Sequence, residues 1–247
     1  MHQTKKKIAE KLPNNTSATT GSSRFIAVEG PIGVGKTTLA RRLAKTLGAA
    51  TILEEANPFL QDFYQTPGPM ALPVQLHFLM ARRKAMRAIS PVSVPPGAGS
   101  IKSVSSKSDT PWVSDFLFSR DQLFASLTLD EKQYALYLEI ATELAFDLML
   151  PDLVVYLQAP LEVLYDRIEI RGNSFEQSIA SGYLARVQHA YTEFFYTYNE
   201  TPVLIVNASE IDFARNEHDY ARLVEQITSI EAGRHYFNPS PEEAPVA

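Results

Sequence analysis

The chain has 247 residues, no cysteine and a formal net charge of −5, with 45% hydrophobic and 21% charged residues. The absence of cysteine excludes disulfide bonds and thiolate zinc sites, and the acidic balance argues against a broad nucleic-acid surface. No apolar run approaches the roughly 20 residues that a membrane-spanning helix needs. We therefore expect one globular α/β domain with neither a nucleic-acid nor a membrane partner.

The first residues, "MHQTKKKIAEKLPNNTSATTGSSR", lack the apolar core of a secretory signal. Their basic, Ser/Thr-rich composition leaves a mitochondrial transit peptide as an alternative, but we expect residues 1–23 to be a disordered tail of a cytoplasmic protein. Residues 90–111 are rich in Ser, Pro and Gly and cannot bury enough apolar surface to fold, so we expect a mobile insertion there. The folded domain is expected at residues 24–231, followed by a flexible C-terminal tail at residues 232–247.

The first predicted element is the apolar strand "RFIAVEG", and a helix is expected from Gly35 to Leu47 because Leu39 and Leu43 recur on one face. Four further strands are expected at "ATILEE", "VSDFLF", "PDLVVYLQAP" and "PVLIVNAS". Helices are expected at residues 74–87, 130–150, 161–170, 183–198 and 218–230. This alternation is typical of a five-stranded parallel sheet flanked by helices, whose ligands bind at the carboxyl ends of the strands.

The turn between the first strand and the first helix reads "GPIGVGKTT" and fits the phosphate-binding pattern G-x-x-x-x-G-K-[ST]. Its glycines let backbone N–H groups point at phosphate oxygens, and the helix start adds partial positive charge. Lys36 is expected to reach the β- and γ-phosphates, and Thr37 to offer its hydroxyl to Mg²⁺. The residues expected to hold a nucleoside triphosphate here are Gly30, Pro31, Ile32, Gly33, Val34, Gly35, Lys36, Thr37 and Thr38.

Carboxylates follow the second and third strands. Glu54 and Glu55 leave the second strand, where a glutamate could accept a proton from an attacking hydroxyl; a solvated acidic turn is the alternative. Asp115 interrupts the apolar run of the third strand, and because a buried carboxylate is costly without a cation, we expect it to support Mg²⁺ beside Thr37. Arg120 and Asp121 follow on the next turn, and a surface ion pair between them is one interpretation.

Two basic side chains stand at the end of the fourth helix. Arg167 and Arg171 are four residues apart, so they share a helix face just before the break at Gly172. Such a pair at a flexible break could clamp transferring phosphates, and a solvated basic face is the alternative.

Gln75 and Arg82 are seven residues apart, so they share a helix face with apolar neighbours. This face could form a pocket wall, because a glutamine with an arginine can read the hydrogen-bonding edge of a purine or pyrimidine. An amphipathic helix with polar boundary residues is the alternative.

Taken together, the motifs "VEGPIGVGKT", "NPFL", "VSDFLF" and "RGN" resemble those of the deoxynucleoside kinase family, in particular bacterial deoxyadenosine and deoxyguanosine kinases, from about residue 25 to about residue 230. The resemblance implies a P-loop kinase with a helical lid. It also implies ATP- and Mg²⁺-dependent phosphorylation of the 5′-hydroxyl of a deoxyribonucleoside in nucleotide salvage, with a purine favoured. Members of the family are commonly homodimers, and helices 74–87 and 130–150 could pair.

The resemblance also assigns roles to residues. It implies Glu54 as the base for the 5′-hydroxyl, with Glu55 as the alternative. The implied catalytic residues are Lys36, Glu54, Arg167 and Arg171. The implied substrate-binding residues are Glu54, Tyr64 at the sugar, Gln75 and Arg82 at the base, Asp115, Asp121 orienting the arginine, and the lid carboxylate Glu176. Thr37 and Asp115 are the implied metal ligands, and Asp212 and Phe213 belong to the loop implied to hold the donor adenine.

The sequence departs from the family at two positions. Phe116 follows Asp115 where the family usually has an arginine, and Asn173 stands where a third lid arginine is common. Each lost charge contact would weaken transition-state binding by about 1–3 kcal/mol unless something compensates. A nucleoside monophosphate kinase and a nucleotide-binding regulator without catalysis are the alternative functions.

Overall fold

The computed structural model describes residues 24–87, 89, 110–144, 149–173, 176, 179 and 181–239. The expected N-terminal tail at residues 1–23 lies outside the described residues, as do residues 90–109 of the expected insertion. Within the part of the chain that is described, no helix is both long and apolar enough to cross a membrane.

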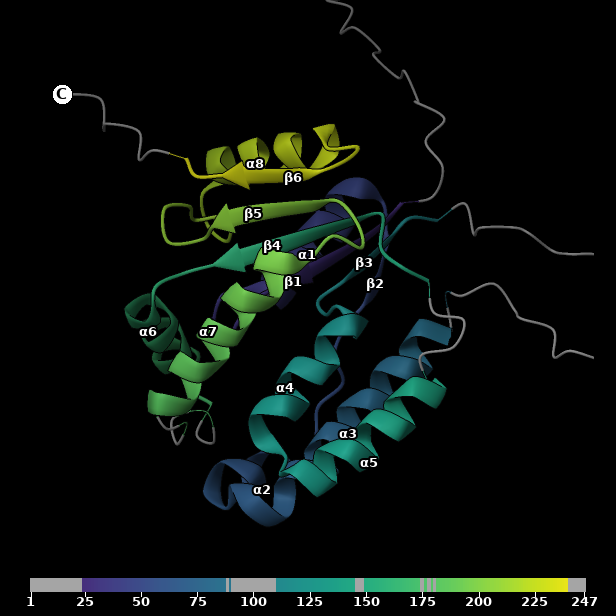
Figure 1. Ribbon diagram of the computed structural model, residues 1–247. Helices are drawn as coiled ribbons and strands as arrows, with labels where there is room; N and C mark the ends of the chain where they lie inside the picture. The colour runs from purple at the N-terminus through teal and green to yellow at the C-terminus, as the bar shows by residue number, and fades with distance from the viewer. Residues whose placement is uncertain are drawn as a thin grey trace, which may run out of the picture.

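Six parallel strands form one sheet in the order β2-β3-β1-β4-β5-β6 (Figure 1). The strands are β1 Phe25–Glu29, β2 Ala50–Ile52, β3 Trp112–Ser114, β4 Leu153–Gln158, β5 Val203–Asn207 and β6 Arg234–Phe237. The expected parallel sheet flanked by helices is confirmed, but the sheet has six strands instead of five.

The additional strand, β6, lies in the segment 232–247 that was expected to be a flexible tail. It pairs with the free edge of β5, and the guanidinium of Arg234 donates to the carbonyls of Phe195 (2.7 Å) and Tyr198 (2.8 Å). None of its four side chains is buried, so it carries no apolar run. Edge pairing and one arginine hold this strand, which hydrophobic patterning does not reveal.

The third strand is also shorter than expected, ending at Ser114 instead of residue 118. Ser114 Oγ donates to the carbonyl of Phe116 at 2.7 Å, and the carboxylate of Asp115 accepts hydrogen bonds from outside the strand. The chain therefore leaves the sheet at Asp115 because polar side-chain contacts replace the strand ladder.

The helices are α1 Lys36–Leu47, α2 Leu60–Gln65, α3 Pro67–Arg87, α4 Asp121–Thr128, α5 Glu131–Leu144, α6 Leu161–Arg171, α7 Ser181–Thr197 and α8 Glu217–Ser229, with a 3₁₀ turn η1 at Phe118–Arg120. α3 begins seven residues before the predicted start at residue 74. Pro67 and Pro69 lie in its first turn, where a missing N–H needs no partner, and Pro73 lies inside the helix. Of the expected lid between α6 and α7, residues 174, 175, 177, 178 and 180 lie outside the described residues.

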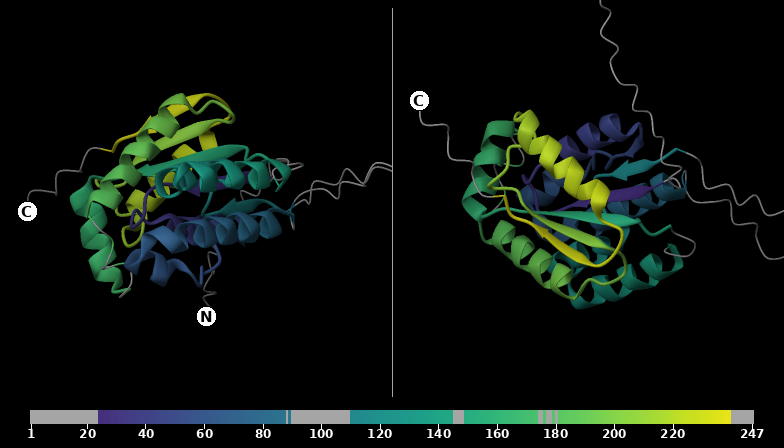
Figure 2. Two further views of the ribbon diagram at one scale, coloured as in Figure 1. Left: turned by 60° about the horizontal axis from the view of Figure 1, so that its bottom comes forward. Right: turned by 90° about the horizontal axis from the view of Figure 1, so that it is seen from above.

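The helices cover both faces of the sheet (Figure 2). Leu43 of α1 and Leu223 of α8 pack in the cluster on one face, and Leu123 of α4 and Tyr191 of α7 pack in the cluster on the other. α3 and α5 lie against α4 beyond the second layer. This arrangement leaves the carboxyl ends of β1, β2 and β3 facing α3, α4 and the α6–α7 connection.

Candidate active site

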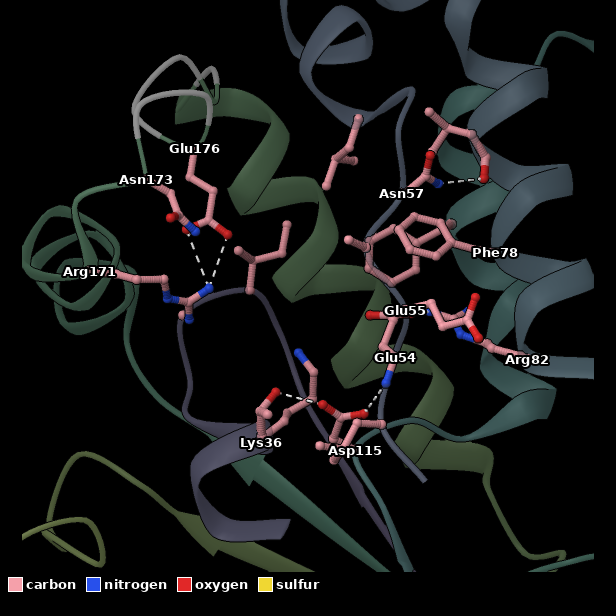
Figure 3. A pocket seen from close by; sticks show the side chains of 18 of the residues that line it. Lys36, Glu54, Glu55, Asn57, Phe78, Arg82, Asp115, Arg171, Asn173 and Glu176 are labelled. Carbon is pink, nitrogen blue, oxygen red and sulfur yellow. Dashed lines mark hydrogen bonds and ion pairs between the residues drawn. The ribbon is translucent and has the colours of Figure 1, made fainter. Parts of the chain in front are cut away.

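One cavity of about 640 Å³ lies at these strand ends. Figure 3 shows Arg171, Asn173 and Glu176 on one side of it, Glu54 and Arg82 on the other, and Lys36 and Asp115 between them. Of the residues expected in the site, the cavity brings together Ile32, Gly33, Gly35, Lys36, Thr37, Thr38, Glu54, Tyr64, Gln75, Arg82, Asp115, Arg171 and Glu176.

The phosphate loop is a backbone cradle held in a conformation that requires glycine. Gly30 and Gly33 have φ angles of 149° and 85°, and an added Cβ would lie 2.5 Å from the carbonyl oxygen of Leu157 and 2.8 Å from that of Leu164, respectively. The Lys36 ammonium donates to the carbonyls of Gly30 (2.8 Å) and Pro31 (3.2 Å). Lys36 is therefore held over the loop, where a bound phosphate would exchange for these carbonyls.

Thr37 and Asp115, the two expected metal ligands, are hydrogen-bonded to each other. Thr37 Oγ1 donates to Asp115 Oδ2 at 2.6 Å, and the backbone N–H of Glu54 donates to Asp115 Oδ1 at 2.7 Å. No group of three or more His, Cys, Asp or Glu side chains that could hold a metal occurs among the described residues. The hydroxyl and the carboxylate fit Mg²⁺, which prefers oxygen ligands and usually takes the rest of its shell from substrate phosphates and water.

Glu54 and Glu55 have different surroundings. The carboxylate of Glu54 pairs with Arg82 and is 28% exposed, whereas the side chain of Glu55 is 54% exposed and lies 4.0 Å from the Lys84 ammonium. Burial raises the pKa of Glu54 to about 7, against the opposing charges of Arg120 and Lys36. A carboxylate with a pKa near neutrality suits a general base, and of the two glutamates Glu54 is the less exposed one.

Arg82 connects this carboxylate to the expected base-reading face. Its guanidinium pairs with both Glu54 and Asp121 and lies 5.0 Å from the ring centre of Phe78. Asp121 does not line the cavity and holds Arg82 from behind. Gln75 lines the cavity, and its Nε2 donates to Thr128 Oγ1 at 3.1 Å.

Glu176 and Arg171, both expected in the lid, form an ion pair. Arg171 Nη1 donates to the two carboxylate oxygens of Glu176 at 3.0 and 3.3 Å (Figure 3). Tyr64 faces the same side, where burial, with Tyr183 and Glu176 nearby, raises the pKa of its hydroxyl. Asn173 also lines the cavity. Arg171 is thus the lid cation that the structure places in the site.

Arg167 is not brought into the cavity, contrary to the expected phosphate clamp. Its guanidinium donates to the carbonyls of Val34 at 3.1 Å and Ala208 at 2.7 Å. The backbone carbonyls satisfy this cation, so Arg167 ties the phosphate loop to the end of β5. Residues Gly30, Pro31, Val34 and Asp121 likewise lie outside the cavity lining.

The loop after β5 lies against the phosphate loop but outside the same cavity. The side chain of Phe213 is 3% exposed, and its ring lies 3.0 Å from the position of an added Cβ on Gly35. Asp212 Oδ1 accepts from the N–H groups of Ala214 (3.1 Å) and Arg215 (3.0 Å), which closes the turn. The structure places Asp212 and Phe213 next to the start of α1, on the donor side.

Comparison with known proteins identifies the family to which this chain belongs. The family profile described as "Deoxynucleoside kinase" matches residues 26–231. The chain belongs to the deoxynucleoside kinase family. A member of this family is a phosphotransferase that phosphorylates a deoxynucleoside with a nucleoside triphosphate as donor.

Several known proteins are similar to this deoxynucleoside kinase. It is 32% identical over 212 residues to the deoxyguanosine kinase of Bacillus subtilis, covering 83% of this chain and 97% of the relative. It is 29% identical over 226 residues to the deoxyadenosine kinase of Dictyostelium discoideum, covering 87% of this chain and 88% of the relative. The deoxyadenosine kinase of M. mycoides with bound dATP has a TM-score of 0.66 at 22% identity, covering 83% of this chain and all of that one, which supports the fold.

Sequence reasoning missed two charged residues of this deoxynucleoside kinase. Glu29, the last residue of β1, is fully buried, and Arg120 is 4% exposed and pairs with it. Arg120 therefore forms a buried ion pair with Glu29, not a surface pair with Asp121. A glutamate at the end of an otherwise apolar strand was the available signal, because a buried carboxylate requires a cation or several donors.

Proposed function

We propose that this kinase transfers the γ-phosphoryl group of ATP to the 5′-hydroxyl of a purine deoxynucleoside, deoxyadenosine or deoxyguanosine, in nucleotide salvage. The observation that supports it is one cavity in which Lys36 and Thr37 of the phosphate loop face Glu54, with Gln75 and Arg82 behind it. A phosphate seat and a hydroxyl-directed base in the same cavity are what a two-substrate kinase needs.

The chain's own residues act mainly by positioning and charge. Glu54 accepts or orients the proton of the 5′-hydroxyl, while Lys36 and Arg171 balance the charge of the moving phosphoryl group. Thr37 and Asp115 would hold Mg²⁺, which when bound neutralises phosphate charge. Arg167 keeps the phosphate loop in place through the carbonyl of Val34.

The preference for a purine rests on similarity and on the base-reading face. Relatives from bacteria and Dictyostelium are named deoxyguanosine and deoxyadenosine kinases, and one from Bacillus subtilis is named deoxyadenosine/deoxycytidine kinase. Gln75 and Arg82 offer donors and an acceptor that suit a purine edge. Tyr64 and Glu176 are assigned to the sugar, Asp121 to holding Arg82, and the Asp212–Phe213 loop to the donor adenine.

An ADP-release assay with each of the four natural deoxynucleosides tests this function. We expect the highest kcat/KM with deoxyguanosine or deoxyadenosine, and no ADP release without Mg²⁺. Preference for thymidine would contradict the purine assignment. Turnover of deoxynucleoside 5′-monophosphates but not of nucleosides would instead indicate a monophosphate kinase, and ATP binding without nucleoside-dependent turnover would indicate a regulator.

We also propose a homodimer through α3 and α5, which pack against each other. Met80 on α3 is 55% exposed and Leu136 on α5 is 46% exposed, so both helices present large apolar side chains to solvent. Light scattering should give twice the 27.5 kDa chain mass. The double variant Met80→Glu with Leu136→Glu should be monomeric, and an unchanged mass for that variant would exclude this surface.

A further inference from the structure

The carboxylate of Glu29 is a buried anchor point at the end of β1. Its Oε1 accepts from the N–H of Gly30 (2.9 Å) and the hydroxyl of Tyr191 (2.8 Å), and its Oε2 accepts from the N–H of Leu117 (2.8 Å) and from Nε of Arg120 (2.9 Å). Although burial opposes ionisation, Arg120, Lys36 and the two backbone donors hold the pKa of Glu29 below its usual value. Glu29 is therefore a fully satisfied anion that fixes the guanidinium of Arg120.

Glu29 fixes the guanidinium of Arg120, but one guanidinium nitrogen has no hydrogen-bond partner among the described residues. The side chain of Arg120 is 4% exposed, and its Nη2 is buried without a hydrogen-bond partner among the described residues. A buried guanidinium N–H without an acceptor is costly, so the free nitrogen indicates an acceptor that a ligand supplies. Because replacing a buried ion pair by apolar residues is often neutral or stabilising, stability alone does not explain the Glu29–Arg120 pair.

Arg120 belongs to the same cavity as the reacting groups. Arg120 lines the cavity that also contains Lys36 and Glu54, and its charge acts on both of them. Its guanidinium also lies 4.7 Å from the ring centre of Phe124. Arg120 thus faces the place where the donor phosphate and the acceptor hydroxyl must meet.

The residue directly after Asp115 does not supply a cation there. Phe116 is 1% exposed and packs in an apolar cluster with Phe25, Ile52 and Met86. Arg120, one 3₁₀ turn further along the chain, enters the cavity instead. The charge that Phe116 does not provide is therefore available from a residue that the sequence motif does not mark.

Building on the proposed function, we propose that Arg120, held by Glu29, donates its free Nη2–H to an oxygen of the phosphoryl group as this group reaches the nucleoside. In that step the bond from the γ-phosphorus to ADP breaks with its electron pair leaving on ADP, and a bond to the 5′-oxygen forms. The hydroxyl proton passes to Glu54. Arg120 exchanges no atom and remains bound to the phosphate of the nucleoside monophosphate product.

Product binding separates this role from a structural one. The dissociation constants of the full chain are measured by calorimetry for the deoxynucleoside that turns over best and for its 5′-monophosphate. Arg120→Gln should raise the dissociation constant of the monophosphate by about tenfold or more, the scale of one charged contact. It should raise the dissociation constant of the nucleoside by less than about threefold. Arg120→Lys keeps the charge and should recover most of the monophosphate affinity. Arg87→Gln, a matched change at the exposed end of α3, should alter neither.

Equal weakening of both ligands by Arg120→Gln, or an unchanged monophosphate affinity, would overturn the proposal. If Arg120→Gln does not fold because the Glu29 carboxylate is left unpaired, the double variant Glu29→Gln with Arg120→Gln removes both charges. The ratio of its monophosphate affinity to its nucleoside affinity then decides. If the unmodified chain releases no ADP with any nucleoside, the proposed function itself is wrong. That result is distinct from a failure of the Arg120 assignment alone.

Discussion

The hydroxyl oxygen of Thr37 lies 2.6 Å from Oδ2 of Asp115, although the two residues are 78 positions apart in the sequence. The other oxygen of the same carboxylate accepts from the backbone N–H of Glu54 at 2.7 Å. One buried side chain therefore connects the first turn of α1 to the chain just after β2.

Asp115→Asn tests this connection. The amide keeps the shape but removes the charge that would support Mg²⁺, so we expect kcat to fall by about tenfold to a hundredfold and the Mg²⁺ concentration for half-maximal rate to rise. Rates measured across a Mg²⁺ titration check both effects. A lower kcat with an unchanged Mg²⁺ requirement would show that Asp115 acts only by holding Glu54.

The pH dependence should report on Glu54. Because burial raises its pKa to about 7, the carboxylate is protonated at lower pH and cannot accept the hydroxyl proton. We expect kcat/KM to rise with pH up to about 7 and then to level off, with about a tenfold loss per pH unit well below that value. Initial rates from pH 5.5 to 8.5 measure the profile. A midpoint near the ordinary glutamate pKa would contradict the effect of burial.

The Arg171–Glu176 pair should control recognition of the sugar. Glu176→Gln removes the charge that holds Arg171 and weakens the contact expected at the 3′-hydroxyl, so the KM for the deoxynucleoside should rise by about tenfold while that for ATP changes less. Comparing each deoxynucleoside with its 2′,3′-dideoxy analogue isolates the 3′ contact. Glu176→Gln should narrow the difference between them, and an unchanged difference would place the 3′-hydroxyl elsewhere.

The phosphate loop predicts a difference between two glycines. Gly33→Ala adds a Cβ 2.8 Å from the carbonyl oxygen of Leu164 at a φ of 85°, whereas Gly48→Ala, at a φ of 62°, meets nothing within 4 Å. We expect Gly48→Ala to lower the free energy of unfolding by about 1 kcal/mol, the cost of left-handed backbone, and Gly33→Ala to cost about 1–3 kcal/mol more. Urea denaturation measures both, and equal losses would contradict the clash.

Patterns of apolar residues predicted the central parts of this fold. β1, β4 and β5 are continuous apolar runs, and the α1 helix begins and ends at glycines, so the core and the phosphate loop could be placed from sequence. Shorter elements were missed for physical reasons. β6 has no buried side chain, and the chain at Asp115 leaves the sheet because of hydrogen bonds to residues far away in sequence.

The same distinction applies to the site. Motif spacing identified Lys36, Glu54 and Asp115, which the structure brings into one cavity. Spacing alone did not show that Arg167 donates to backbone carbonyls or that Arg120 is buried, because both depend on which long-range partner each guanidinium reaches. The partner of a charged side chain with several possible partners can be identified only from the three-dimensional structure.

The central claim is that Glu54, and not Glu55, acts on a nucleoside hydroxyl at the phosphate loop. The most direct measurement is kcat for Glu54→Gln beside the matched variant Glu55→Gln, with ATP affinity measured for each. We expect Glu54→Gln to lose about a hundredfold or more in kcat with ATP binding intact, and the exposed Glu55→Gln to keep kcat within about threefold. The reverse pattern, or equal activity in both variants, would contradict the assignment.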